Sequence, residues 1–234
     1  MNRGIYAAAT GMMTNQRWMD VTANNMANVN TAGFKQDQLL FNDQLQNAVD
    51  AQGNSVGGMG SGPVPMSEFS DMTSGSITQT GNPLDVAIEG PGMFQVQAPN
   101  GVMYTRSGSF KISPTRELTT SDGLAVLDNA GRPIDLAKGE VAIDAEGNVM
   151  VDGKATAKLQ IYSGSFKKEG ANLFSAPDAQ PKPDFVLHES SIEGSNVNVI
   201  QAMADLIKLG RNFELSQKSI QTQDDMTQKL IQSL

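Results

Sequence analysis

The chain has 234 residues, enough for one large domain or two small ones, and only 6% of them are aromatic and 18% charged. Its 17 Lys and Arg stand against 25 Asp and Glu, for a formal net charge of −8. This balance excludes a nucleic-acid partner, because duplex binding needs clustered positive charge, and the absence of cysteine excludes disulfides, thiol chemistry and zinc–thiolate sites. Few charges and many small polar residues favour packing against copies of the same chain.

The N-terminal segment 1–10 holds one basic residue and an apolar run that is too short for the core of a signal peptide. No stretch approaches the roughly 18 consecutive apolar residues of a membrane-spanning helix. We therefore expect no membrane insertion, and export without a cleaved signal peptide.

Apolar residues then recur at steps of seven, with alanines between them, which predicts one long N-terminal helix: Ile5, Met12, Met19 and Met26. The helix is expected to end between Val29 and Ala32, because several asparagines and Gly33 follow each other there. Asparagines are poor interior helix formers with strong hydrogen-bonding amides, so they indicate either a specific polar interface or a network that caps the helix.

The C-terminal end repeats the seven-residue pattern at Val199, Leu206, Phe213 and Ile220, which predicts a second helix. About 38 residues at roughly 1.5 Å rise would span about 57 Å, more than a globule of this size hides. We expect the two ends, residues 1–35 and 186–234, to pair as one discontinuous, coiled-coil-like polymerisation domain.

Between the ends, apolar residues alternate with polar ones in short runs, and turn signals recur about every ten residues. This pattern predicts a central all-β domain over residues 73–185, of the sandwich or irregular barrel type. The region 36–72 is rich in glycine and is expected to be an extended linker. The predicted fold class is α+β, with the β domain inserted between the helices.

No constellation of residues predicts catalysis, a cofactor or a metal. His188 is the single histidine, and the glycines at 57–62 lack the Gly-Lys-Ser/Thr ending of a phosphate-binding loop. Asp85 and Glu89 could form a carboxylate pair, but strand alternation places both on the solvent face. We therefore expect a protein that is not an enzyme.

Several motifs resemble the bacterial flagellar basal-body rod and hook family. They run from Ala23 to Lys35, where Ala32 stands in place of the family's usual proline, from Thr80 to Gly90, from Tyr104 to Phe110 and from Ile192 to Asn198. The motifs occur in the same order as in the family, and together they cover most of the chain. The short segment between Lys35 and Gly81 makes the chain most similar to the proximal rod protein, with a distal rod or hook-type subunit as the alternative.

The resemblance implies a rod subunit that is exported by the flagellar type III apparatus and polymerises across the periplasm, where the rod transmits torque from motor to hook. Its implied partners are copies of itself, other rod subunits on each side and the export apparatus. Rivals from other classes are a soluble enzyme, for which the sequence shows no site, and a secreted surface-binding β module. A surface-binding module would need a platform of neighbouring aromatic side chains. The Trp and Tyr residues of this chain are few and far apart in the sequence: Tyr6, Trp18, Tyr104 and Tyr162.

We predict that the N-terminal stripe packs against the C-terminal stripe and that polar residues fix the stagger between subunits. Small residues at Ala8, Gly11 and Gly210 would allow close helix approach. A heterologous contact that does not close on itself then propagates a filament. The residues assigned to this assembly interface are Ile5, Met12, Met19, Asn24, Asn25, Met26, Asn28, Asn196, Val199, Leu206, Phe213 and Ile220.

Overall fold

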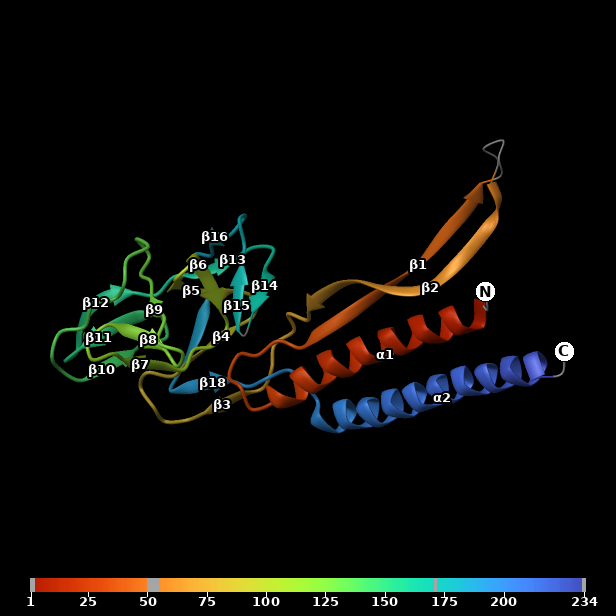
Figure 1. Ribbon diagram of the computed structural model, residues 1–234. Helices are drawn as coiled ribbons and strands as arrows, with labels where there is room; N and C mark the ends of the chain where they lie inside the picture. Colours follow the sequence, from red (N-terminus) through yellow and green to blue (C-terminus); the bar gives the residue numbers. More distant parts are fainter. Residues whose placement is uncertain (1–2, 50–54, 171, 233–234) are drawn as a thin grey trace. The chain divides into compact units, whose positions relative to one another are not determined.

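The computed structural model describes residues 3–49, 55–170 and 172–232, and it divides the chain into two compact units (Figure 1). The helical unit comprises Met1–Ala27, Asp37–Phe69 and Asn198–Leu234, and the β unit comprises Asn28–Gln36 and Ser70–Val197. The fold class is α+β, as predicted. The segment after the first helix, Asn28–Gln36, belongs to the β unit, although the sequence assigned residues up to 35 to the helical domain.

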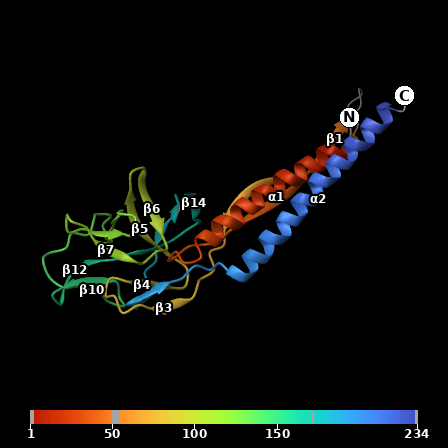
Figure 2. The same cartoon turned by 60° about the horizontal axis from the view of Figure 1, so that its bottom comes forward.

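Two long helices lie side by side in the helical unit, α1 at Arg3–Ala27 and α2 at Val199–Gln232 (Figures 1 and 2). Asn198 caps α2, because its side-chain Oδ1 accepts a hydrogen bond from the backbone N–H of Gln201 at 3.1 Å. The helix α1 ends at Ala27, a little earlier than predicted. Whether the pair supercoils stays a prediction.

The region that was expected to be a linker instead contains two strands, β1 at Asp37–Val49 and β2 at Ser55–Ser70, which pair in a two-stranded sheet. Asn25 of α1 fixes the start of β1: its amide donates to the carbonyl of Asp37 at 2.8 Å and accepts from the Asp37 N–H at 2.9 Å. Glycine-rich sequence is a weak strand former, so composition alone does not indicate this ribbon.

The β unit is built around a nine-stranded sheet with the order β14-β15-β6-β5-β9-β8-β7, in which β13 also pairs with β5 and β16 with β13. A three-stranded sheet, β10-β11-β12, and the pairs β17-β4 and β18-β3 complete it. The strands are β3 Ile77–Gln79, β4 Val86–Glu89, β5 Met93–Ala98, β6 Gly101–Thr105, β7 Phe110–Ile112, β8 Leu118–Thr120, β9 Ala125–Val126, β10 Val141–Ile143, β11 Asn148–Val151, β12 Lys154–Lys158, β13 Ile161–Ser163, β14 Lys167–Gly170, β15 Leu173–Ser175, β16 Gln180–Pro181, β17 Val186–Glu189 and β18 Ser191–Glu193.

One apolar core fills the β unit, and it includes the edge-to-face ring pair Phe94 and Phe110, whose centroids lie 5.1 Å apart. A smaller cluster on β5, β6 and β15 adds Tyr104, whose ring lies 5.5 Å from both Tyr162 and Phe166. The fold thus gathers aromatics that are scattered in the sequence. Because Tyr104 is buried, this cluster packs as a core and does not form a binding platform.

Four turns of the β unit share one five-residue geometry. In each, a side-chain oxygen of the first residue accepts the N–H of the fifth, and the first and fourth residues are also joined through the backbone. The fourth residue has positive φ and is glycine in three turns, whereas Arg116 takes this place at 68° in the fourth. The turns are Ser113–Glu117, Thr120–Leu124, Asp128–Arg132 and Asp144–Asn148.

Candidate functional site

The predicted C-terminal stripe is the less exposed side of α2. Its members alternate steps of three and four residues, and Ala202 and Leu209 are the most deeply buried of them. Since α1 is the helix that lies along α2, this stripe is covered within the chain (Figure 2). The members of this stripe are Val199, Ala202, Leu206, Leu209, Phe213, Ser216, Ile220 and Gln223, and Asp205 and Gly210 beside them are also partly buried.

The N-terminal stripe is only partly covered. Met12, Met19 and Met26 are half-buried on α1, while the side chain of Ile5 lies outside the described residues. A Cβ atom added at Gly11 or Gly210 would meet nothing within 4 Å, so neither glycine serves a close helix approach inside the chain, and a close approach between subunits stays a prediction.

The predicted asparagines occupy four different environments. Asn25 is buried against β1, and Asn24 is exposed on α1. Asn28 belongs to the β unit and accepts a hydrogen bond from Thr31 Oγ1 at 3.2 Å in the turn after α1. Asn196, in the segment before α2, binds the β unit, because its Oδ1 accepts the Gln36 N–H at 2.8 Å.

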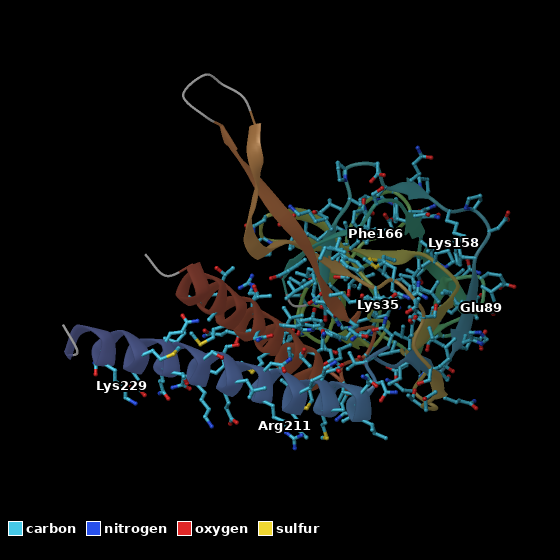
Figure 3. All side chains as sticks on the ribbon, turned by 90° about the vertical axis from the view of Figure 1, so that its right-hand side faces the viewer. Lys35, Glu89, Lys158, Phe166, Arg211 and Lys229 are labelled. Carbon is cyan, nitrogen blue, oxygen red and sulfur yellow. The ribbon has the colours of Figure 1, made fainter. Side chains whose placement is uncertain are left out.

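A second apolar strip runs along the opposite side of α2 and is exposed. Ile200 is 82% exposed, Ile207 61% and Leu215 64%, and Met203 lies one turn from both isoleucines. Arg211, one turn after Ile207, points away from α1 (Figure 3). We call Ile200, Met203, Ile207 and Leu215 the outer strip of α2.

Three charged side chains meet in the interior of the β unit at the carboxylate of Glu193. Lys35 Nζ lies 2.7 Å from Glu193 Oε1, and Arg106 Nε lies 2.6 Å from Glu193 Oε2 (Figure 3, Lys35). All three side chains are at most 3% exposed. We call Lys35, Arg106 and Glu193 the junction cluster, because Lys35 follows α1 in the chain and Glu193 precedes α2.

The remaining polar groups of the junction cluster are matched by backbone partners. Arg106 Nη2 donates to the carbonyls of Ile88 at 2.8 Å and Gly90 at 2.6 Å, and Nη1 donates to Gly92. Lys35 Nζ also donates to the carbonyl of Thr73 at 2.7 Å. Two cations thus share one carboxylate, and carbonyl oxygens offset the surplus positive charge.

The segment from Ala32 to Gln36 is held residue by residue in the β unit. The amide of Asn172 donates to the Ala32 carbonyl at 3.0 Å, and the Gly33 N–H donates to the Glu193 carbonyl at 2.8 Å. Phe34 is buried beneath Lys168, whose Nζ lies 4.3 Å from the ring centroid. A Cβ added at Gly33 would lie 2.5 Å from the backbone of Arg106, so only glycine fits.

The pKa values in the junction cluster follow from burial and charge. Burial would raise the pKa of Glu193, but the hydrogen bond from Lys35 and the charge of Arg106 outweigh it, so this pKa lies below its ordinary value. Burial lowers the pKa of Lys35, and the hydrogen bond and charge of Glu193 oppose the change only in part.

Acid is therefore expected to destabilise the β unit through Glu193. The pKa of Glu193 is lower in the folded protein than its ordinary value of 4.5. The ionised carboxylate therefore stabilises the fold at pH values above 4.5, and this stabilisation is lost as the pH falls through the lower pKa of the folded state. Unfolding by urea between pH 7 and pH 3 should show this loss in the wild type. The pH dependence should be shallower in Glu193→Gln, although Asp128 and Asp144, whose pKa values are also lowered, keep part of it. Equal slopes would contradict this assignment.

Sequence reasoning did not assign the junction cluster, although a signal was present. Each of its three residues is the single charge of one of the quoted motifs. What the sequence could not supply is the contact between segments that are 158 and 87 residues apart.

The other candidates for chemistry have structural roles. Asp85 is buried, contrary to the expectation from strand alternation, and accepts hydrogen bonds from Thr80 Oγ1 at 2.7 Å and Asn82 Nδ2 at 3.1 Å. Glu89 is exposed (Figure 3). Its carboxylate oxygen Oε2 lies 3.1 Å from His188 Nε2. Among the described residues, no group of three or more His, Cys, Asp or Glu could hold a metal ion. Within the same ranges, no helix has the length and apolar character needed to cross a membrane.

Three family models match successive parts of the chain. Residues 5–35 match the flagella basal body rod protein model, residues 87–151 the flagellar hook protein FlgE/F/G D1 domain, and residues 188–233 the flagellar basal body rod FlgEFG protein C-terminal model. Each matched segment contributes one member of the junction cluster: Lys35, Arg106 and Glu193, in that order.

Whole-length relatives agree with these matches. The flagellar basal-body rod protein FlgF of Rhizobium meliloti (strain 1021) is 33% identical over 244 residues, which cover 100% of this chain and 98% of the relative. The rod protein FlgG of Bacillus subtilis (strain 168) is 32% identical over 260 residues, which cover 99% of this chain and 98% of the relative. FlgF of Caulobacter vibrioides is 32% identical over 250 residues, which cover 100% of this chain and 98% of the relative.

The three models and the whole-length relatives place the chain in the class of flagellar rod and hook proteins. The chain belongs to the flagellar basal-body rod protein family. It is a structural subunit of the bacterial flagellar rod, located in the basal body.

Proposed function

We propose that this subunit self-assembles, alongside other rod subunits, into the axial tube that carries torque from the motor to the hook, and that the outer strip of α2 makes the contact between subunits. The observation that carries the proposal is the exposure of Ile200, Met203, Ile207 and Leu215 on the side of α2 that α1 does not cover. Ile200, Met203 and Ile207 follow each other at successive turns, and an exposed apolar run of this kind is typical of protein interaction sites.

The energy available from the outer strip is sufficient for a specific contact. Full burial of a large aliphatic side chain stabilises by roughly 1.5–3 kcal/mol, so three of them contribute on the order of 5 kcal/mol before the entropy of association is subtracted. The predicted stripe at Val199, Leu206, Phe213 and Ile220 then holds α2 to α1, and the opposite strip is left for the neighbour. A contact between the outer strip and a different surface of the neighbour would propagate as a filament, provided that it does not close on itself.

Met203→Asp is expected to reduce incorporation into basal bodies at least tenfold, because it places a charge without a partner in the middle of the outer strip. Val186→Asp is the matched control, since Val186 is 54% exposed and Met203 51%, but Val186 lies on β17 in the β unit. The measurement is the amount of each variant in purified basal bodies, together with swimming of the complemented strain. Normal incorporation of Met203→Asp would rule out the outer strip as the contact.

We further propose that the junction cluster holds the two chain segments that lead into α1 and α2, so that load on the helices reaches the β unit through a buried ionic contact rather than through a free linker. This proposal is supported by the depth of burial and by the number of hydrogen bonds on Glu193, which accepts from Lys35, Arg106 and the Gly75 N–H at 3.0 Å.

For the place of the subunit along the axis, we propose the proximal rod, with the distal rod as the alternative. The proposal rests on the short segment between Lys35 and Gly81, since relatives named FlgF and FlgG match at similar identity. Export through the flagellar type III apparatus and passage of the rod across the periplasm belong to the same proposal. The ratio of this subunit to the hook protein in basal bodies tests its position, because the proximal segment is short.

A further inference from the structure

The outer strip of α2 contains a sulfur atom in its middle. The sequence has 13 Met and no Cys, so every oxidisable sulfur in the chain is a thioether. Met203 is half exposed, one turn after Ile200 and one turn before Ile207. A peroxide in solution can therefore reach Met203 while its nearest neighbours on that face are aliphatic.

We propose that Met203 is an oxidation site at which peroxides reversibly block subunit assembly. The inference rests on the proposed function, because it assumes that the outer strip becomes buried against a neighbour. The thioether sulfur takes one oxygen atom from hydrogen peroxide as the O–O bond breaks, which gives methionine sulfoxide and one molecule of water. The sulfur is oxidised, the peroxide is reduced, and no other co-reactant is needed.

The effect follows from the change in polarity. A sulfoxide oxygen is a strong hydrogen-bond acceptor, and its burial between Ile200 and Ile207 without a donor opposes docking. The free subunit exposes Met203, whereas an assembled subunit would cover it. Oxidation is therefore expected to act on subunits before they assemble and to leave assembled ones unchanged.

Met13 provides an internal comparison. It is 71% exposed on α1, more than Met203, and so should be oxidised at least as fast. Its exposed neighbours on the same side of the helix are Gln16, Arg17 and Asp20, so one more polar atom changes little there. Oxidation of Met13 is expected to leave assembly unaffected.

The test uses the purified full-length chain, treated with hydrogen peroxide and mapped by peptide mass spectrometry. Association with an immobilised copy of the untreated chain is expected to weaken at least tenfold once Met203 is oxidised. Methionine sulfoxide reductase with dithiothreitol as the reductant should restore it, because the sulfoxide returns to the thioether, its oxygen leaves as water and the dithiol becomes a disulfide. Peroxide-treated and untreated Met203→Leu chains should associate equally well with the immobilised untreated chain, whereas Met13→Leu should stay as sensitive to peroxide as the wild type.

Two failures are distinguishable. If oxidation of Met203 leaves association unchanged, or if peroxide weakens the association of Met203→Leu as much as that of the wild type, the oxidation inference is overturned and the assembly proposal stands. If the untreated chain does not associate at all, self-assembly through the outer strip is overturned, and the oxidation inference is overturned with it.

Discussion

Replacing Glu193 with Gln is expected to lower the free energy of unfolding of the β unit by about 3–5 kcal/mol, the range for breaking a buried ion pair on one side only. The amide keeps the shape of the side chain, but it leaves Lys35 and Arg106 buried without a negative charge, and all three side chains are at most 3% exposed. The measurement is urea unfolding followed by circular dichroism, with hydrogen exchange at β4, β5 and β18 to assign the loss to the β unit.

Two companion variants test the reasoning behind this expectation. Glu140→Gln removes an exposed carboxylate and should change stability by no more than about 0.5 kcal/mol. Lys35→Met leaves Arg106 and Glu193 as a balanced pair, so it should destabilise less than Glu193→Gln. A Glu193→Gln protein as stable as Glu140→Gln would show that the junction cluster does not hold the β unit together.

Gly33→Ala is expected to destabilise the β unit by roughly 2–5 kcal/mol, through two additive effects. Gly33 has φ of 67°, where a side chain costs about 1–2 kcal/mol, and the added Cβ would lie 2.5 Å from the backbone atoms of Arg106 and Ser107. Overpacking against backbone typically costs a further 1–3 kcal/mol. The clash would displace Lys35 from Glu193, because Lys35 follows two residues later.

Gly81→Ala isolates the conformational part of that effect. Gly81 has φ of 77°, but a Cβ there meets nothing within 4 Å, so only the backbone penalty of about 1–2 kcal/mol remains. The difference between the two variants, measured by thermal and urea unfolding, reports the close approach of the segment to Arg106. Equal losses would mean that the segment around Gly33 is not packed as described.

The helices could be predicted because their signal is local. Apolar residues at every seventh position define one face of a helix, whatever lies elsewhere in the chain. The four residues with this spacing fall on the covered side of α2: Val199, Leu206, Phe213 and Ile220. The same pattern does not reveal the outer strip, because Ile200, Met203 and Ile207 do not belong to that repeat. Their role follows from the exposure of their side chains, which can be known only once the fold is known.

The β1–β2 ribbon and the junction cluster were missed for different physical reasons. The ribbon contains glycine-rich sequence, and the start of β1 is held by a side chain of α1, Asn25, twelve residues before Asp37. The junction cluster depends on pairing between segments at both ends and in the middle of the chain, which carry one charge each. Long-range pairing of single charges leaves no periodic pattern, so only the structure brings Glu193 to Lys35 and Arg106.

The assignment of this chain to the rod can be tested by quantitative mass spectrometry of detergent-purified basal bodies from the source bacterium. We predict that this chain co-purifies with the other rod subunits, at low abundance relative to the hook protein, and that Met203→Asp is depleted from the preparation while Val186→Asp is retained. Absence of the wild-type chain from clean basal bodies would contradict its assignment as an axial rod subunit, and equal retention of both variants would contradict assembly through the outer strip of α2.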